Sequence, residues 1–503
     1  MFGIIMVVSR DKKGALFTMI RLSDCKQIHC IGIGGIGLSA IAEILIFSGY
    51  DVSGSDMRES ETTERLMDHG ANIFLGHRAK NVDGADLVIY SAAIARSNPE
   101  LIRAEEQGIP TASRAEILGM LMKDYENSIA ISGTHGKTTT TSMVSLILRN
   151  AQLDPTILVG GNLSELNGNV RVGNGAFFVT EACEYMDSFL SLKPKIEVIL
   201  NIDSDHLDYF KDIDHIQNSF SRFAGLVPED GVIIAYDANP FVRSVVKGRK
   251  NVITFGFGSG CDYNVEDIIF DASGTPQFYV NYKAARLCGV KLKIPGEHNI
   301  LNALAAIACC RTLGVDVSTI VETLEEYSGT ERRFDILGKT NNNIKIIDDY
   351  AHHPTEIKAT IEAACHMQFN NMWCLFQPHT YTRTIALFDE FAESFEKADI
   401  IVLAEIYAAR EKNIFKISSE SLVDEIKKDY PRKEVYFYPD FDEMAQFVYD
   451  NAEPGDLIIT MGAGDINKVA EKSGRKSARK SPPDSITRKP SRKLRGNRRG
   501  ARA

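Results

Sequence analysis

The most constraining stretch of the sequence is a glycine-rich loop, GTHGKTTT, which begins at Gly133. The short apolar run 129–131 before the loop predicts a buried strand, and the apolar-periodic run 143–148 after it predicts a helix. Glycine lets backbone N–H groups approach phosphate oxygens, and the start of a helix adds unpaired donors and a partial positive charge. A strand, a glycine loop, Lys137 and a helix in this order predict a site for a nucleoside triphosphate.

The loop departs from the general phosphate-loop pattern. That pattern has a glycine five residues before Gly136, but Ile131 stands there, so we interpret the loop as a shortened variant. The spacing assigns Lys137 to the β- and γ-phosphates and the hydroxyl of Thr138 to Mg²⁺. An ordinary turn with a helix cap is the alternative, and Gly-Lys-Thr between a strand and a helix argues against it. The predicted nucleotide-binding residues of the loop are Gly133, Thr134, His135, Gly136, Lys137, Thr138 and Thr139.

A second glycine motif follows the predicted strand 26–33 and consists of Gly32, Gly34 and Gly37. Asp56 lies 19 residues after the last glycine, near the end of the next predicted strand. By spacing this is a dinucleotide fingerprint with Asp56 at the ribose-binding position, in a small Rossmann-like unit. The motif alone indicates a diphosphate near a helix start better than it indicates NAD. Two nucleotide-type loops suggest one nucleotide-bearing substrate and one triphosphate that drives the chemistry.

The length and composition limit the class of protein. A chain of 503 residues predicts about three domains. No apolar run approaches the roughly 20 residues of a membrane span, so we expect no membrane insertion. Basic residues follow the N-terminal run FGIIMVV instead of preceding it, so we expect no signal peptide, and Met19 is a second possible start. Nine scattered cysteines without a C-x-x-C pair indicate reduced thiols in a cytoplasmic protein.

The charge is distributed unevenly along the chain. Residues 471–503 contain 13 Lys or Arg against two acidic residues and carry +11, which leaves −21 on residues 1–470. We expect this tail to be disordered, because it is polar, basic and without apolar periodicity. An acidic body argues against a specific nucleic-acid partner, although the tail could contact nucleic acid nonspecifically.

Acidic clusters follow two predicted strands downstream of the phosphate loop. Glu181 follows the strand 176–180, and His206 lies shortly after the strand 196–202. In open α/β sheets ligands bind beyond the carboxyl ends of the strands, so Glu181 and His206 are candidate Mg²⁺ ligands. Helix capping is an equal alternative for the neighbouring acids Glu184, Asp203 and Asp208.

Further along, amide, histidine and arginine side chains gather at predicted element ends. Asn299 and Asn302 share one face of a predicted helix and either present amides to a purine edge or cap the helix. In the last part of the chain, two successive predicted strands end in polar sequences, DDYAHHP from Asp348 and QPHTYTR from Gln377. Such strand ends indicate one catalytic edge in another parallel α/β unit.

Ten motifs together resemble one family. GIGGIG, GTHGKTTT, EACEYMDSF, NIDSDHLDYF, GEHNILNALAA, GTERRFDILG, DDYAHHPTEI, QPHTYTRT, YAAREK and GAGDI stand in this order between residues 22 and 470. The chain resembles the Mur ligase family, and most closely its alanine-adding members. The resemblance implies an α/β fold with an N-terminal Rossmann-like UDP-substrate domain (1–125), a central P-loop-type ATPase domain (126–326), a C-terminal Rossmann-like amino-acid-binding domain (327–470) and a basic tail (471–503).

The resemblance also implies roles for individual residues. Lys137 and Arg333 contact the phosphates of ATP, and Asp349 and His352 belong to a catalytic site that the last domain completes. Tyr350, His379 and Arg383 are placed near the incoming amino acid. The remaining implied sites are adenine (Asn299, Asn302), Mg²⁺ (Thr138, Glu181, His206) and the UDP-sugar (Gly32, Gly34, Gly37, Asp56).

The activity implied by the resemblance is ATP-dependent joining of L-alanine to the lactyl carboxylate of UDP-N-acetylmuramate through an acyl phosphate, in cytoplasmic peptidoglycan precursor synthesis. The enzyme would act as a monomer or homodimer with ATP and Mg²⁺. Related ligases that add later residues carry a carbamylated lysine about 14 residues after the Asp-His pair, where this chain has Phe220. The alternatives are a related ligase for a recycled tripeptide, an NAD-dependent dehydrogenase, and a noncatalytic nucleic-acid binder.

Overall fold

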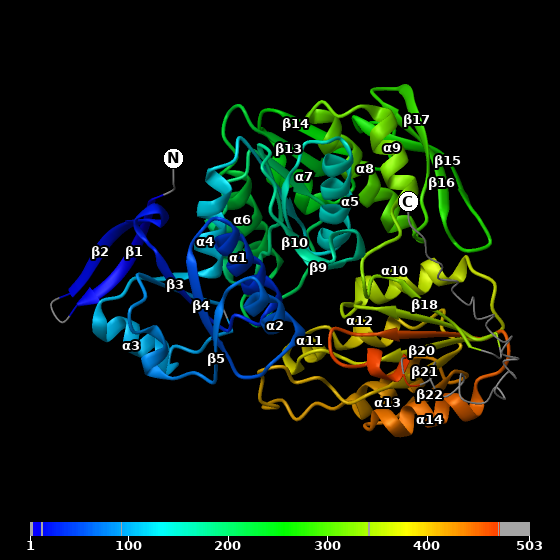
Figure 1. Cartoon of the computed structure of the whole chain (residues 1–503). Coiled ribbons are helices and arrows are strands. Elements are labelled where there is room, and N and C mark those ends of the chain that lie inside the picture. The colour runs from blue at the N-terminus through cyan, green and yellow to red at the C-terminus, as the bar shows by residue number, and fades with distance from the viewer. Residues whose placement is uncertain (1–3, 12–13, 92, 341–342, 471, 473–503) are drawn as a thin grey trace, which may run out of the picture.

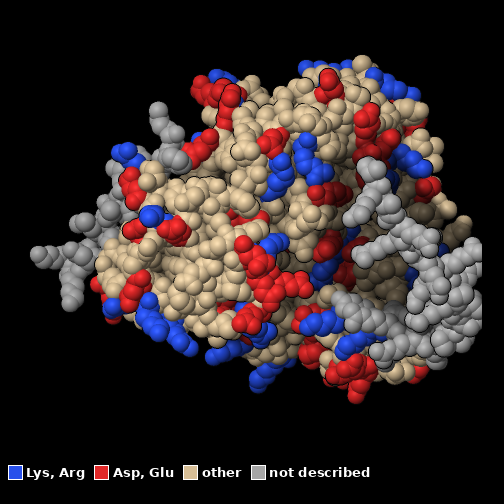
Figure 2. Space-filling model, viewed as in Figure 1, with Lys and Arg blue, Asp and Glu red and all other residues tan. Residues whose placement is uncertain are grey.

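The computed structural model describes residues 4–11, 14–91, 93–340, 343–470 and 472. Three α/β domains follow one another along the chain (Figure 1), with the N-terminal domain at lower left, the central domain at the top and the C-terminal domain at lower right. The predicted basic tail lies outside the described residues except for Lys472. On the face seen in Figure 2, acidic and basic side chains are interspersed. Among the described residues, no helix combines the length and apolar character needed to cross a membrane.

The N-terminal domain is a five-stranded parallel sheet with helices packed on it. The chain leaves the central strand β3 first to one side and then to the other, so the glycine motif after β3 lies at a topological switch point. In spatial order, the strands are β5 (Asn72–Leu75), β4 (Asp51–Asp56), β3 (Gln27–Ile31), β6 (Leu87–Tyr90) and β7 (Thr111–Ser113). The helices are α1 (Ile36–Phe47), α2 (Glu61–Asp68), α3 (Pro99–Gln107) and α4 (Arg114–Lys123).

An antiparallel hairpin, β1 (Ile4–Asp11) with β2 (Gly14–Arg21), precedes this domain. It lies beside α3, α4 and β7.

Inside the N-terminal domain, the carboxylate of Glu100 is fully buried. It accepts hydrogen bonds from Ser55 Oγ at 2.6 Å and from Asn81 Nδ2 at 2.6 Å, which supply the partners that a buried charge needs.

The central domain is built on a ten-stranded sheet. Its strand β8 lies between β11 and β12, all three parallel, so the segments that follow these strands meet at one edge. In spatial order, the strands are β10 (Gly168–Arg171), β9 (Thr156–Leu163), β11 (Phe177–Glu181), β8 (Asn127–Ser132), β12 (Ile196–Ile199), β13 (Val232–Tyr236), β14 (Val252–Phe255), β15 (Tyr263–Phe270), β16 (Pro276–Tyr282) and β17 (Ala285–Lys291). The helices are α5 (Lys137–Asn150), α6 (Ile213–Ala224), α7 (Pro240–Val246), α8 (Glu297–Thr312) and α9 (Val317–Glu326).

The C-terminal domain has a six-stranded sheet, parallel except for its edge strand β18. Its core includes Trp373, which is buried and donates from Nε1 to Asp456 at 2.9 Å. In spatial order, the strands are β18 (Asp335–Lys339), β19 (Lys345–Asp349), β23 (Leu457–Met461), β20 (Met372–Phe376), β21 (Ile400–Leu403) and β22 (Glu434–Phe437). The helices are α10 (Pro354–Cys365), α11 (Tyr381–Ala386), α12 (Phe388–Glu393), α13 (Ser419–Asp429) and α14 (Phe441–Asn451).

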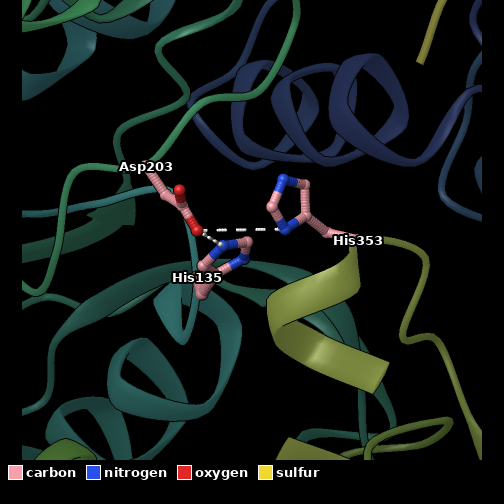
Figure 3. Close-up of side chains that lie close together, drawn as sticks. All are labelled: His135, Asp203 and His353. Carbon is pink, nitrogen blue, oxygen red and sulfur yellow. Dashed lines mark hydrogen bonds and ion pairs between the residues drawn. The ribbon is translucent and has the colours of Figure 1, made fainter. Parts of the chain in front are cut away.

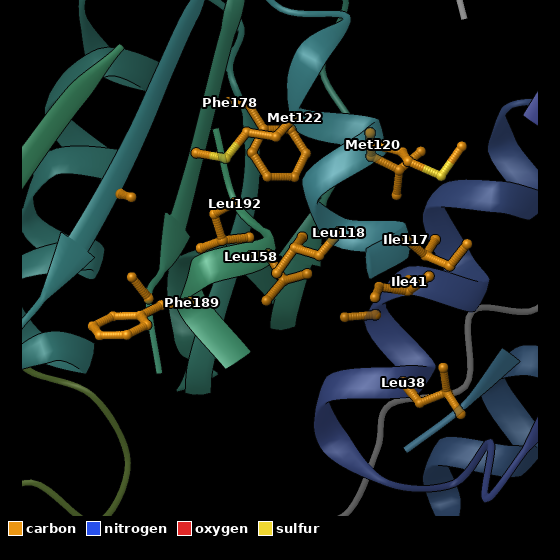
Figure 4. Close-up of a cluster of buried hydrophobic side chains, with 14 of the residues drawn as sticks. Leu38, Ile41, Ile117, Leu118, Met120, Met122, Leu158, Phe178, Phe189 and Leu192 are labelled. Atoms are coloured by element: carbon orange, nitrogen blue, oxygen red, sulfur yellow. The ribbon is translucent and has the colours of Figure 1, made fainter. Parts of the chain in front are cut away.

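The N-terminal and central domains share one hydrophobic core. Helix α4 joins them: it packs on α1 on one side and on the 3₁₀ segment Tyr185–Ser191 on the other. Figure 4 shows this arrangement, with Ile117 near Ile41 of α1 and Met122 against Phe178 of β11. Gly119 of α4 lies so close to Ser191 that a Cβ there would overlap the Ser191 carbonyl. Among the residues that the structure describes, the buried clusters of the C-terminal domain contain only residues of that domain.

Candidate active site

The phosphate loop has the backbone that its glycines predict. Gly133 and Gly136 have φ of +134° and +84°, a region that L side chains rarely adopt. Gly136 is the residue before α5, and a Cβ there would lie 2.5 Å from Asn302 Oδ1. The amide of His135 donates to Asn201 Oδ1 at 2.8 Å, and Thr134 Oγ1 accepts from the amide of Asp203 at 2.9 Å. The segment after β12 therefore supports the loop.

Lys137 is folded back onto its own loop. Its Nζ donates to the carbonyl of Gly133 at 2.5 Å, to that of Thr134 at 3.1 Å and to Glu184 Oε2 at 2.9 Å. Burial alone would lower the pKa of Lys137, but the Glu184 carboxylate outweighs burial and the pKa is raised. The sequence left Glu184 open between capping and function, and the structure makes it the buried counter-ion of Lys137.

The three predicted Mg²⁺ ligands lie around the start of α5. Thr138 and Glu181 border two consecutive glycines of β9: a Cβ at Gly160 would meet the Glu181 carboxylate at 2.6 Å, and a Cβ at Gly161 would lie 3.4 Å from Thr138. Glu181 Oε1 accepts from the Gly160 amide at 2.5 Å. Two oxygen-bearing side chains beside two consecutive glycines of β9 fit a small cation that prefers oxygen ligands.

The third predicted ligand, His206, contacts other carboxylates. Among the described residues, the carboxylates within 4.0 Å of His206 Nε2 are those of Asp205 at 3.8 Å and Glu184 at 4.0 Å, so Glu181 is not in contact with it. His206 has a positive φ of 54°, and its ring packs on Tyr185 with centroids 4.8 Å apart. Glu184 thus lies between Lys137 and His206.

A first cavity of about 470 Å³ opens beside the phosphate loop and α8. Asn299 and Asn302 line it and are buried; Asn302 Nδ2 donates to Asn299 Oδ1 at 3.0 Å. The amide pair therefore faces a space of nucleotide size as well as lying in the first turns of a helix. Other lining residues are Gly136, Thr139, Tyr236, Phe255, Arg333 and Asp349.

The C-terminal domain contributes Asp349 and His352 at the end of β19. Burial raises the pKa of Asp349 to about 6, and its Oδ2 accepts from Thr360 Oγ1 at 2.8 Å. His352 Nδ1 lies 2.9 Å from the carbonyl of Tyr350. A carbonyl only accepts, so Nδ1 carries the proton and Nε2 has the free lone pair. Burial lowers the pKa of His352 to about 3, below the 6.5 of a free imidazole, so the ring is neutral.

A second cavity of about 500 Å³ lies on the other side of the 203–206 segment. His379 and Arg383 line it, and Arg383 Nη1 donates to His379 Nδ1 at 3.2 Å. Burial and the Arg383 charge lower the pKa of His379 to about 4. Tyr350 lines neither cavity; its ring lies 5.1 Å from the guanidinium of Arg333.

The central and C-terminal domains meet in a cluster of two histidines and a carboxylate, His135, His353 and Asp203. Figure 3 shows Asp203 beside the rings of His135 and His353, with Oδ2 3.1 Å from His135 Nε2 and 3.9 Å from His353 Nδ1. His353 precedes α10, and its Nε2 donates to the carbonyl of Ser204 at 2.9 Å. The first turn of α10 is thereby fixed to the central domain.

The N-terminal glycine motif forms the expected turn after β3. The amide of Gly34 donates to Asp56 Oδ2 at 2.9 Å, and Gly32 has a φ of +80°. In this structure the Asp56 carboxylate therefore holds the loop itself. The guanidinium of Arg114 lies over Gly37, 3.0 Å from where a Cβ would be. A cation at a glycine loop suits a diphosphate, and Arg114 was not predicted from the sequence.

Besides Arg114, two residues of the site were not predicted from the sequence: Asp205 and Glu356. Each contacts a residue far away in the chain, and short-range spacing gives no signal for such pairs. Glu356 has one local signal, because it stands three residues after His353 and completes a capping box at the start of α10.

Phe220 stands where the sequence has no lysine for carbamylation. It is fully buried with its ring edge against Phe189, so an apolar contact fills this position of α6.

Comparison with known proteins places this geometry in a family. The Mur ligase family catalytic domain matches residues 27–126, the Mur ligase middle domain matches 131–310, and the Mur ligase glutamate ligase domain matches 332–464. Curated relatives named UDP-N-acetylmuramate–L-alanine ligase, from Clostridium botulinum (strain Langeland) and Alkaliphilus metalliredigens, are 52% and 49% identical. Each alignment covers 89% of this chain, and 97% and 96% of the relative.

Solved structures agree with the sequence comparison. A UDP-N-acetylmuramate-alanine ligase from Thermotoga maritima is 31% identical with a TM-score of 0.77, covering 91% of this chain and 100% of that one. A murein peptide ligase from Psychrobacter arcticus is 26% identical with a TM-score of 0.67, covering 89% of this chain and 98% of that one. The chain therefore belongs to the Mur ligase family.

Proposed function

We propose that this chain joins L-alanine to the lactyl carboxylate of UDP-N-acetylmuramate, using ATP and passing through an acyl phosphate. The observation that carries the proposal is the 203–206 segment, which contributes Asp203 to the first cavity and His206 to the second. A nucleotide in the first cavity and an acceptor in the second would meet at this segment. The relatives at about 50% identity support L-alanine as the amino acid.

The first step brings two anions together, the lactyl carboxylate and the γ-phosphate. Positive charge held in place before the reaction lowers the barrier to such a step. Lys137 and Arg333 supply that charge from the two domains that border the nucleotide cavity. Bound Mg²⁺ would neutralise phosphate charge as a Lewis acid. The residues that would hold it are Thr138, Glu181 and His206.

The second step needs a neutral amine to attack the acyl carbon. His352 is the candidate base, since its Nε2 lone pair is free and its ring neutral. A pKa near 3 makes the ring a weak base, so an anionic substrate beside it is needed to raise its proton affinity. Asp349, with a pKa of about 6, stays mostly ionised at neutral pH and adds negative charge on the same strand end.

The amino acid is assigned to the second cavity. Arg383 provides a cation there for its carboxylate, and His379 provides a neutral hydrogen-bonding ring. The C-terminal domain covers the site from one side, which would exclude water that hydrolyses an acyl phosphate. The UDP group is assigned to the N-terminal glycine motif, with Gly32, Gly34, Gly37, Asp56 and Arg114.

The test is phosphate release by the purified protein with ATP, Mg²⁺ and UDP-N-acetylmuramate, surveyed across amino acids. We expect release with L-alanine to exceed that with glycine, L-serine or the tripeptide L-alanyl-γ-D-glutamyl-diaminopimelate by at least tenfold in kcat/KM. Preference for the tripeptide would assign the chain to the peptide-recycling ligases. Absence of sugar-dependent phosphate release with every acceptor would refute the proposal.

A further inference from the structure

His135 of the phosphate loop reaches into the C-terminal domain. Its Nε2 lies 3.1 Å from Asp203 Oδ2 of its own domain, and its Nδ1 lies 3.2 Å from Glu356 Oε1 of α10. All three side chains are partly or largely shielded from solvent. None of the steps proposed above uses these contacts.

The geometry requires a cation at His135. A carboxylate oxygen only accepts hydrogen bonds, so each ring nitrogen that faces one must donate, and a ring that donates from both nitrogens is an imidazolium. Burial alone would lower the pKa of His135, but the hydrogen bonds to Asp203 and Glu356, together with their charges, raise it to about 9. The proton is therefore bound at neutral pH.

Glu356 continues the connection toward the catalytic segment. While Oε1 pairs with His135, Oε2 accepts from the backbone amides of His352 at 3.0 Å and His353 at 3.3 Å. The same oxygen lies 3.3 Å from His352 Nδ1. One carboxylate thus joins the phosphate loop to the backbone that carries the candidate base.

The cluster in Figure 3 could also be considered as a metal site, because His135, Asp203 and His353 offer ligand atoms within 4.8 Å of one another. Both nitrogens of His353 are already used, however: Nε2 donates to Ser204 and Nδ1 accepts from the amide of Thr355 at 3.2 Å. Thr355 Oγ1 also donates to Asp203 Oδ2 at 2.7 Å. The imidazolium of His135 itself supplies the positive charge between the carboxylates.

We propose that His135 is a positioning residue that couples the nucleotide loop to the C-terminal domain, through an imidazolium shared by Asp203 and Glu356. When the charge is present, Glu356 is neutralised and the segment with His352 is held against the loop. When it is absent, two uncompensated carboxylates face each other beside the phosphates. The part that concerns His352 rests on the proposed function; the part that concerns nucleotide binding does not.

The test is a charge-compensation cycle with His135→Gln, Glu356→Gln and the double variant. Calorimetry gives the Kd for ADP, and steady-state assays give kcat and the KM for ATP. We expect His135→Gln to raise the Kd for ADP and to lower kcat by tenfold or more. In the double variant the second charge is also removed, so ADP affinity and kcat should each be at least threefold higher than in His135→Gln. Losses that multiply in the double variant, or a His135→Gln protein with wild-type values, would overturn the proposal.

A pH arm separates charge from packing. The groups facing His135 are Asp203 from the segment after β12, Glu356 from α10 and the ring of His353 4.8 Å away. Neither carboxylate titrates above pH 7, and burial together with the nearby His135 lowers the pKa of His353. Affinity for ADP should therefore fall as the pH rises through about 9 in the wild type and stay flat in His135→Gln. Parallel pH curves would contradict the coupling.

Controls keep the outcomes distinct. His69→Gln removes another partly exposed histidine that faces a carboxylate, Glu43 at 3.9 Å in the N-terminal domain, and should match the wild type. If His135→Gln fails to fold, as judged by thermal melting, Glu356→Gln alone still tests the contact through ADP affinity. ADP coupling without alanine-dependent turnover would refute the proposed function and support the coupling. Normal turnover without ADP coupling would do the reverse.

Discussion

The guanidinium of Arg383 in the C-terminal domain lies 2.9 Å from the carboxylate of Asp205 in the central domain, and both side chains are largely buried. Burial alone would raise the pKa of Asp205, but the Arg383 charge outweighs burial and holds this pKa well below its ordinary range. Asp205 therefore fixes the position of Arg383, the candidate substrate-binding cation, and it does so from the segment that also contains His206. Arg383 was predicted from the sequence, whereas its partner Asp205 was not.

Asp205→Asn tests this pair. Loss of one partner leaves a buried charge uncompensated, which costs about 3–5 kcal/mol in comparable buried pairs. We expect a lower melting temperature and a raised KM for L-alanine, because Arg383 loses its fixed orientation. Thermal unfolding and amino-acid titrations measure the two effects. Asp208→Asn, at the rim of the same cavity, is the control, and equal behaviour of the two variants would argue against the role of the pair.

Lys137→Ala tests the phosphate loop. The lysine is the loop's own ammonium and is bonded in this structure to two loop carbonyls and Glu184. We expect ADP formation to fall at least a hundredfold, while binding of the UDP-sugar by the N-terminal domain stays within twofold. Product assays and calorimetry measure these quantities. Lys247→Ala, an exposed lysine of the same domain, is the matched control; turnover in Lys137→Ala at the control level would remove the lysine from the mechanism.

His206→Ala tests the assignment of the metal ligands. Because His206 lies nearer to Glu184 and Asp205 than to Glu181, the metal would have to draw Glu181 and His206 together. We expect the Mg²⁺ concentration for half-maximal activity to rise at least fivefold. Binding of Mn²⁺ followed by electron paramagnetic resonance gives a second readout without turnover. An unchanged metal titration relative to His215→Ala would exclude His206 from the site.

Gly119→Ala tests the core shared by the first two domains. A Cβ at residue 119 would overlap the backbone carbonyl of Ser191, so α4 would have to move away from the central domain. Overpacking of this kind typically costs about 1–3 kcal/mol. We expect a lower melting temperature that thermal unfolding detects, whereas Gly260→Ala, whose Cβ would meet nothing within 4 Å, should melt like the wild type. Identical melting curves for Gly119→Ala and Gly260→Ala would show that the contact between residue 119 and Ser191 accommodates a methyl group without loss of stability.

Glu100 predicts how acid acts on the N-terminal domain. Burial alone would raise the pKa of Glu100, but the ring of His29, 3.8 Å away, and the hydrogen bonds from Ser55 and Asn81 outweigh burial and lower the pKa to about 2. A depressed folded-state pKa contributes stability above the ordinary carboxyl pKa of about 4.3, and the contribution is lost as the pH falls toward 2. The free energy of unfolding, measured with urea between pH 6 and 3, should therefore fall more steeply with decreasing pH in the wild type than in Glu100→Gln. Equal slopes would contradict the shift.

Much of the fold could be predicted from periodicity, and the differences have local causes. The predicted strand 129–131 lies within β8, and the predicted strand 176–180 differs from β11 by one residue at each end, because buried parallel strands are continuous apolar runs. The predicted strand 196–202 is too long, since β12 ends at Ile199 where Asn201 turns to support the phosphate loop. The predicted helix 143–148 extends to Lys137–Asn150, because its buried threonines show no apolar period.

The site could be predicted only as residues at strand ends. Parallel strands explain why Lys137, Glu181 and His206 lie at one edge of the central sheet. Which side chain pairs with which depends on loop paths and on the position of the C-terminal domain. Spacing could not pair Lys137 with Glu184 or His135 with Glu356, because the members of each pair lie 47 and 221 residues apart.

The single tryptophan, Trp373, lies in the C-terminal domain, whose buried clusters, within the described part of the chain, are separate from those of the other two domains. Its indole emission therefore reports on the C-terminal domain alone, while far-ultraviolet circular dichroism averages over the whole chain. Comparison of the two unfolding transitions therefore tests whether one free energy of unfolding describes this protein, because transitions that do not coincide exclude two-state unfolding. Domain-resolved denaturation is open to this chain without any introduced label.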